Sequence, residues 1–130
     1  MVILGLTGSI GMGKTTAAGM LGELGVPVCD SDALVHGMLA RGGVATEPVG
    51  ATFAGVVLHG AVDHGALAAK VFGDETALAR LEAIIHPLVR LAQGRFLRNQ
   101  ATRRQSLVAL DVPLLFESDT HVLCDAVAVV

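Results

Sequence analysis

The first thirty residues alternate apolar segments with glycine-rich or polar ones, and this pattern predicts a strand, a helix and a second strand. Residues 2–6 are almost continuously apolar, as in a strand buried on both faces of a parallel sheet. From Lys14 to Leu24 apolar residues recur at helical spacing, and Gly25 is a suitable residue to end that helix. Residues 26–29 then predict a short second strand.

Helices dominate the middle of the predicted structure. Residues 33–39 and 63–72 have helical spacing, whereas residues 44–60 show poor periodicity and receive no firm assignment. A stronger helix starts after Asp74, a candidate N-cap. Pro87 should end or kink that helix because proline lacks an N–H group, and a further helix should reach about Gln105.

The last part of the chain returns to strands. Residues 106–110 predict a strand that ends at Asp111, and residues 125–130 predict one more buried strand. Because strands alternate with helices, the predicted fold class is α/β with a mainly parallel sheet flanked by helices. Residues 41–105 are too long for one crossover, so we interpret them as a mostly helical, substrate-binding insertion between core segments 1–40 and 106–130.

Composition narrows the class of protein. The 130 residues suit one domain, and 52% hydrophobic but only 3% aromatic residues predict a core of Ala, Val, Leu and Ile. A net charge of −3 argues against nucleic acid as the main partner. We expect no membrane span, because no apolar run reaches about 18 residues. Two distant cysteines and an N-terminus without signal-peptide features favour reduced thiols and a cytoplasmic location.

Residues 8–15 fit the phosphate-binding loop pattern, in which Gly8 is followed after four residues by Gly13, Lys14 and Thr15. Glycines here and at Gly11 allow positive φ angles and let backbone N–H groups surround an anion at a helix N-terminus. Lys14 would contact the β- and γ-phosphates of a nucleotide, and the Thr15 hydroxyl would bind Mg²⁺. The pattern therefore predicts a nucleotide site.

Acidic residues follow two other predicted strands. Asp30 and Asp32 follow the second strand, and Asp111 ends the strand 106–110. Ligands of open parallel sheets lie beyond the carboxyl ends of the strands, so these aspartates should lie beside the phosphate loop. We assign Asp32 as general base and Asp111 as a metal-side acid acting through water. The alternative for Asp32 is capping of the helix that starts at Ala33.

Two features of the middle segment remain open on the residues alone. His86, next to Pro87, could bind a substrate phosphate or cap the predicted helix break, and the residues favour the structural role. Six of the seven arginines lie between residues 80 and 104, and we interpret them as a solvent-exposed face of the helices, although an anionic substrate could bind near one of them.

Four motifs, in matching order and spacing, resemble the N-terminal two-thirds of bacterial dephospho-CoA kinases. They are residues 6–16 (LTGSIGMGKTT), 25–32 (GVPVCDSD), 86–88 (HPL) and 111–117 (DVPLLFE). The resemblance implies a P-loop nucleotide-kinase fold and transfer of the ATP γ-phosphate to the ribose 3′-hydroxyl of dephospho-CoA, the last step of coenzyme A synthesis. It also implies that Gly11, Met12, Gly13, Lys14, Thr15 and Thr16 contact ATP, that Asp32 is the base, and that Asp30, His86 and Pro87 lie on the substrate side.

The sequence departs from the family pattern in two respects. Met12 and Thr15 stand where the family often has serine, and Thr15 keeps the metal-binding hydroxyl. Family members continue past a strand like 125–130 into an arginine-bearing lid and an adenine-contacting loop, which are not in this sequence, so reduced activity is expected. The alternatives are another small-molecule kinase with the same core, or a module that binds ATP without transferring phosphate.

Overall fold

The computed structural model describes residues 1–8, 12–111 and 123–129. The chain divides into two compact units. One comprises Met1–Asp32 and Ala92–Val130 and is called the sheet unit below. The other comprises Ala33–Leu91 and is called the helical unit.

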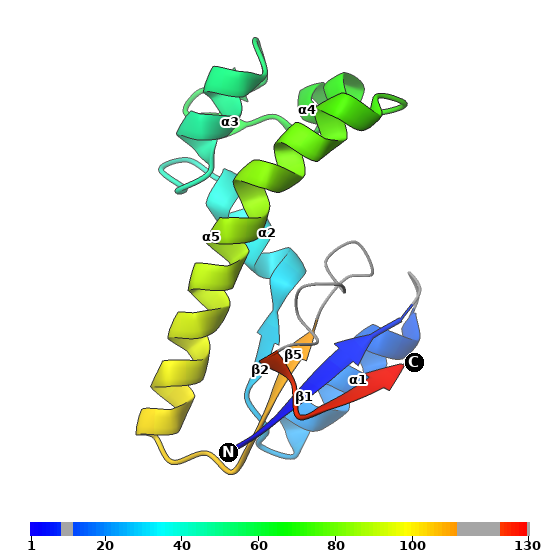
Figure 1. Ribbon diagram of the computed structural model, residues 1–130, viewed down its shortest axis with the longest axis vertical. Coiled ribbons are helices and arrows are strands. Elements are labelled where there is room, and N and C mark those ends of the chain that lie inside the picture. The colour runs from blue at the N-terminus through cyan, green and yellow to red at the C-terminus, as the bar shows by residue number, and fades with distance from the viewer. Residues whose placement is uncertain (9–11, 112–122, 130) are drawn as a thin grey trace. The chain divides into compact units, whose positions relative to one another are not determined.

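The sheet unit contains a four-stranded sheet in which every pair of neighbouring strands is parallel. Its strand order is β2-β5-β1-β6, so the two N-terminal strands are not neighbours and β5 lies between them (Figure 1). This parallel sheet with flanking helices confirms the predicted α/β class. The strands are β1 (Val2–Thr7), β2 (Val28–Asp30), β5 (Leu107–Asp111) and β6 (Ala126–Val129).

Strand register aligns the carboxyl ends of three strands. Asp111 at the end of β5 lies opposite Leu6 of β1 on one side and Asp30 of β2 on the other. Strand β5 is central, and its residues Val108 to Leu110 have no solvent exposure. Because β5 is buried on both faces, its sequence is a continuous apolar run that ends in a charged residue.

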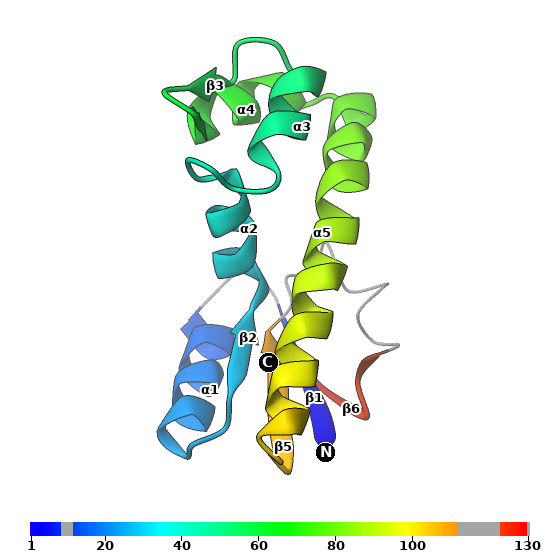
Figure 2. The same cartoon turned by 90° about the vertical axis from the view of Figure 1, so that its left-hand side faces the viewer.

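Helix α1 (Met12–Glu23) connects β1 to β2 and packs on β1, β2 and β5. It ends where predicted: Gly25 has φ +81°, and the Val26 N–H donates to the Leu21 carbonyl over 2.9 Å. Such a left-handed residue at a helix C-terminus favours glycine, which has no Cβ. Figures 1 and 2 show α1 on one face of the sheet and the end of α5 that follows Ala92 on the other.

Strand β6 confirms the expected strand near residue 125 but corrects its predicted burial. The Val127 side chain is 48% exposed, because β6 pairs with β1 alone and is an edge strand of the described sheet.

The helical unit is built from short elements and the first part of one long helix. Residues 44–60, which received no assignment from their periodicity, contain a short helix and the start of an antiparallel hairpin. Helices α2 and α5 each begin in one unit and end in the other. The elements are α2 (Ser31–Leu39), α3 (Thr46–Thr52), β3 (Val57–Leu58), β4 (Ala61–Val62), α4 (His64–Val71) and α5 (Glu75–Thr102).

Helix α5 starts as predicted but does not end at Pro87. The Ala77 N–H donates to Asp74 Oδ1 over 3.0 Å, which confirms Asp74 as an N-cap. The helix then runs through Pro87 without a break, so the predicted pair of helices is one. Pro87 and Ala83 are both exposed, so the carbonyl that loses its N–H partner lies on the solvent side. Ile85 and Val89 are buried on the inner face of α5, where their packing stabilises the helix on both sides of Pro87.

A side-chain hydrogen bond and a glycine stabilise the turn between α2 and α3. The buried Thr46 hydroxyl donates to the Ala40 carbonyl over 2.8 Å. At Gly43 an added Cβ would clash with the Met38 carbonyl oxygen, so only glycine fits there. None of the helices in the described ranges combines the length and apolar composition that a bilayer crossing requires.

Candidate functional site

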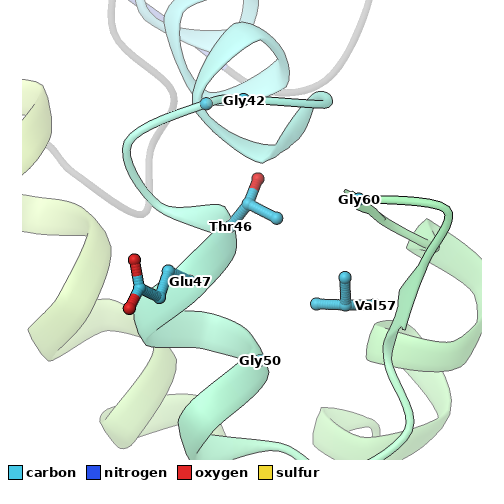
Figure 3. A pocket seen from close by; sticks show the side chains of 7 residues that line it. Gly42, Thr46, Glu47, Gly50, Val57 and Gly60 are labelled. Carbon is cyan, nitrogen blue, oxygen red and sulfur yellow. The ribbon is translucent and has the colours of Figure 1, made fainter.

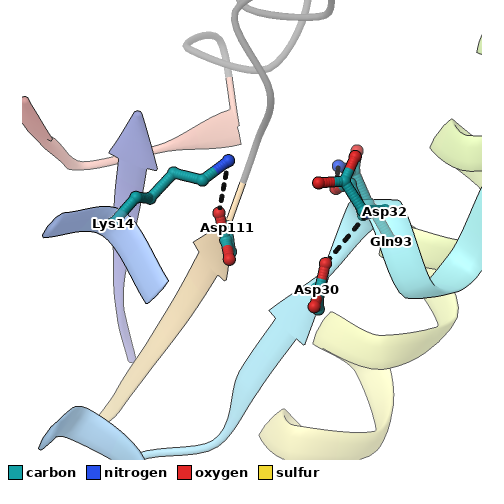
Figure 4. Close-up of polar contacts among 6 residues, drawn as sticks. Lys14, Asp30, Asp32, Gln93 and Asp111 are labelled. Atoms are coloured by element: carbon teal, nitrogen blue, oxygen red, sulfur yellow. Dashed lines mark hydrogen bonds and ion pairs between the residues drawn. The ribbon is translucent and has the colours of Figure 1, made fainter. Parts of the chain in front are cut away.

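Charged side chains from three neighbouring parts of the sheet unit meet at the carboxyl end of the sheet (Figure 4). Asp111 ends β5, Asp30 ends β2, and Lys14 comes from the first turn of α1, which follows β1. The aligned register places these chain positions side by side, although they are far apart in the sequence. The parallel topology therefore brings the predicted phosphate-binding lysine to the predicted acidic residues.

Lys14 and Asp111 form an ion pair. Lys14 Nζ lies 3.0 Å from Asp111 Oδ1, and the two side chains are only 13% and 10% exposed. Burying these two charges costs hydration free energy, and their mutual attraction repays only part of that cost, because the pKa of the Asp111 carboxyl stays above its ordinary value. The pair holds the ammonium group at the strand ends, where an anionic ligand would compete with Asp111 for it.

Burial raises the pKa of the Asp111 carboxyl above its ordinary value. Lys14 opposes this rise through a hydrogen bond and its positive charge, while the nearby negative charges of Asp30 and Asp32 add to it. The ionised carboxylate is thus less favourable in the folded chain than in water. A cation placed beside Asp111 would relieve this penalty.

Asp30 and Asp32, two residues apart, have different roles. The Asp32 N–H donates to Asp30 Oδ1 over 2.9 Å, so Asp30 caps α2 (Figure 4). The alternative that Asp32 is the N-cap is therefore wrong: the helix begins at Ser31, two residues earlier than predicted. The Asp32 side chain is exposed, and within the described ranges its carboxylate accepts no hydrogen bond.

The sequence alone did not reveal a buried polar pair that includes Ser31, the residue before Asp32. Gln93 Nε2 of α5 donates to the Ser31 hydroxyl oxygen over 3.2 Å, and both side chains are buried. One signal was available: Gln93 follows the buried Val89 by four residues and so lies on the inner face of the helix. A polar residue at such a position needs a hydrogen-bond partner.

Cys29 lies in β2 directly before Asp30 but is unsuited to act as a nucleophile. Burial, followed by the negative charges of Asp30 and Asp111, raises the pKa of its thiol to about 11. Only the thiolate is strongly nucleophilic, so this side chain is a core residue at neutral pH.

The phosphate-loop residues are only partly visible. Gly8 follows β1, Gly11 lies outside the described residues, and Met12, Gly13 and Thr15 are described by their backbone in α1. Thr16 is exposed in the same helix. The motif 111–117 lies outside the described residues beyond Asp111. The N-terminus of α1 carries the positive end of the helix dipole, which favours an anion beside Lys14.

His86 and Pro87 belong to the helical unit. His86 lies within α5 and is half-buried, so the alternative that it caps a helix break is wrong, because the helix has no break there. In the described part of the chain, no three His, Cys, Asp or Glu side chains group closely enough to hold a metal ion by themselves.

The helical unit also contains an open pocket of about 460 Å³ (Figure 3). Four of its lining residues are glycines, and Glu47 is its one charged residue. In Figure 3 the Glu47 carboxylate points away from Val57, and Val57 lies on the opposite side of the pocket. A phosphate group would find no positive charge among the lining residues, which are Gly42, Gly43, Thr46, Glu47, Gly50, Val57 and Gly60.

Comparison with known proteins gives a consistent family. The model of the family described as dephospho-CoA kinase matches residues 2–130. The dephospho-CoA kinase of Paramagnetospirillum magneticum is 62% identical over 130 residues, which are 100% of this chain and 61% of that protein. That of Mesorhizobium japonicum is 52% identical over 100% of this chain and 65% of its own length. The chain thus spans less than two thirds of these relatives.

Two solved structures share the fold. A crystal structure of a Thermus thermophilus protein is 39% identical, with a TM-score of 0.77 over 99% of this chain and 64% of the other. A dephospho-CoA kinase structure from Campylobacter jejuni has the same TM-score at 23% identity, over 98% of this chain and 64% of the other, and supports the fold alone. The P-loop kinase fold implied by the four sequence motifs is confirmed. The chain belongs to the dephospho-CoA kinase family.

Proposed function

We propose that this chain carries the phosphoryl-transfer site of an enzyme that phosphorylates the ribose 3′-hydroxyl of dephospho-CoA with ATP. The observation that supports it most directly is the meeting of Lys14, Asp111 and the Asp30–Asp32 turn at one edge of a parallel sheet, in a member of this family. A binding module needs the lysine and the glycine loop, whereas transfer to a hydroxyl also needs a carboxylate that can receive its proton.

Lys14 binds the β- and γ-phosphates in this proposal. It leaves Asp111 when the nucleotide arrives, because a phosphate group offers more negative charge than one carboxylate. Backbone N–H groups at the start of α1, including those of Gly13 and Thr15, contact the same phosphates. Gly8, Gly11, Met12 and Thr16 complete the nucleotide contacts.

Asp32 accepts the proton of the 3′-hydroxyl. As the acceptor oxygen bonds to the γ-phosphorus, the bond from that phosphorus to the bridging oxygen breaks, and ADP carries away the electron pair. The Asp32 carboxylate suits this role because it is exposed and is not used in the cap that Asp30 provides. Asp30, whose oxygen accepts the Asp32 N–H, sets the direction of this turn and lies on the substrate side.

Mg²⁺ fits the same residues. It prefers oxygen ligands, keeps several waters, and is commonly held by one or two protein groups together with substrate phosphates. The Thr15 hydroxyl would bind it directly, and Asp111 would do so through water once Lys14 moves to the phosphates. The ion would neutralise charge on the transferring phosphoryl group.

The helical unit is the proposed source of acceptor contacts. The range 41–105, which contains most of this unit, connects two segments of the nucleotide core, and in the proposal it recognises the pantetheine and nucleotide parts of dephospho-CoA. His86 and Pro87 are proposed to lie on this substrate side. A cytoplasmic location is proposed with it, since the substrates are intermediates of central metabolism.

The decisive experiment is mass-spectrometric detection of phosphorylated product after incubation with Mg-ATP and dephospho-CoA. Adenosine and pantetheine serve as rival acceptors, and the Lys14→Ala protein controls for contaminating kinases. Product from dephospho-CoA alone, absent with Lys14→Ala, supports the proposal. Product from a rival acceptor would indicate another small-molecule kinase. ATP binding without any product would indicate a nucleotide-binding module.

A further inference from the structure

One buried hydrogen bond in the sheet unit has no role in the mechanism above. Gln93 Nε2 donates to the Ser31 hydroxyl oxygen over 3.2 Å. Ser31 has no solvent exposure and Gln93 is 1% exposed. Polar groups buried to this degree are retained where a hydrogen bond compensates their lost hydration. The bond therefore fixes residue 31 against the part of α5 in the same unit.

The two partners lie where the chain leaves and re-enters the sheet unit. The unit boundaries fall after Asp32 and before Ala92. Ser31 is the second residue before the first boundary, and Gln93 is the second residue after the other. Their hydrogen bond thus joins the end of the first segment of the sheet unit to the start of its second segment, although 62 residues separate the two partners in the sequence.

Asp32 lies next to this hydrogen bond in the chain. It follows Ser31 directly, and its carboxylate is exposed and accepts no hydrogen bond from the residues that the structure describes. Its place is therefore set by the backbone of the first turn of α2. The contacts that hold that turn include the Asp30 cap at 2.9 Å and the Ser31–Gln93 bond.

We infer that Gln93 is a positioning residue, which acts through Ser31 to hold the Asp32 carboxylate in place for proton transfer. The inference rests on the proposed function, in which Asp32 is the base. Gln93 is itself too deeply buried to touch a substrate. Small displacements of a reacting group have large effects on rate, because the productive geometry is narrow.

The test compares Gln93→Leu with Gln100→Leu, a matched change at a half-buried glutamine of the same helix and unit. Gln93→Leu should lower kcat about 10- to 100-fold and leave the KM for ATP within about twofold. Hydrogen exchange followed by mass spectrometry should show faster exchange of the amides at the start of α2. Gln100→Leu should change neither quantity.

Ser31→Ala provides a second route to the same bond, and it removes only one oxygen atom in case Gln93→Leu does not fold. It should give a comparable loss of kcat, and the double variant Ser31→Ala/Gln93→Leu should be no slower than the worse single variant, because both changes remove one interaction. Additive losses would contradict a shared role.

Failure of the inference and failure of the proposed function give different results. An active parent chain whose kcat survives both substitutions overturns the inference. Unchanged exchange at the start of α2 overturns it as well, whether or not the parent is active. A parent that transfers no phosphate, with faster exchange in Gln93→Leu, overturns the proposed function but leaves the anchoring of the Asp32 turn in place.

Discussion

Polar side chains serve different purposes in the two units of this chain. In the sheet unit, Lys14, Asp30 and Asp111 gather at the carboxyl ends of parallel strands. In the helical unit, a buried polar group such as Thr46 satisfies backbone carbonyls at a turn. Substitutions in the first set should change chemistry, whereas substitutions in the helical unit should change stability. The predictions below test this difference.

Lys14→Ala should have the largest effect. We expect turnover to fall about 1000-fold or more, because a preorganised positive charge on the transferring phosphates is lost. Tight ATP binding, followed by calorimetry, should be lost as well. Lys70→Ala is the matched control, since Lys70 is exposed on α4 in the helical unit. Turnover that survives Lys14→Ala would remove the phosphate-loop assignment.

Asp32→Asn should separate binding from transfer. Loss of the proton acceptor is expected to lower kcat about 100-fold or more, while the Kd for ATP stays within about twofold. Single-turnover kinetics and calorimetry measure the two quantities. Asp63→Asn, an exposed aspartate before α4 without a side-chain cap bond, is the control. Equal losses of binding and transfer would give Asp32 a structural role instead.

Pro87→Ala should change stability in the helical unit. Proline inside a helix costs about 3 kcal/mol relative to alanine, and Pro87 is exposed, so we expect the free energy of unfolding to rise by about 1 to 3 kcal/mol in urea titrations. Ala83→Gly, one turn earlier on the same exposed face, should lower it by about 1 kcal/mol. A loss of stability in Pro87→Ala would mean that the proline ring is needed for packing.

Asp111→Asn should have the smallest effect on stability and should depend on pH. Burial raises the pKa of this carboxyl in the folded chain, so protonation favours folding, and this contribution is lost as pH rises through the raised pKa. The amide should therefore raise the free energy of unfolding at pH 8, on the usual scale of about 1 kcal/mol for a single substitution.

The gain in the free energy of unfolding from Asp111→Asn should shrink as pH falls toward 3.8, the ordinary pKa of an aspartate carboxyl. Urea unfolding at pH 8, 6 and 4.5 measures the trend. An advantage that grows at acid pH would mean that the Lys14 ion pair outweighs the burial of Asp111.

Much of the sheet unit was predictable because its signals are local. A glycine loop between an apolar strand and a helix, and aspartates directly after two strands, are visible within short stretches of sequence. Gly25 could be assigned as a helix end because its φ of +81° suits glycine above other residues. The same holds for one local signal of the helical unit, where Asp74 could be assigned as an N-cap because its side chain reaches an N–H only three residues away.

The helical unit was less predictable because packing there overrides local preference. Pro87 predicted a break, yet buried residues on the inner face of α5 hold one helix across it. Strands β3 and β4 have two residues each, too few to show a period of two. In the sheet unit the role of Gln93 was hidden for a different reason, since its partner is 62 residues away.

The sequence by itself determined which side chains follow each strand and where glycine permits a turn, because covalent order and backbone sterics decide both. The tertiary structure decided which of these side chains meet. Lys14 reaches Asp111, and Ser31 meets Gln93, only because β5 is inserted between β1 and β2 and α5 returns to the sheet unit. Those arrangements arise from the burial of apolar surface between segments far apart in the chain, which no local pattern records.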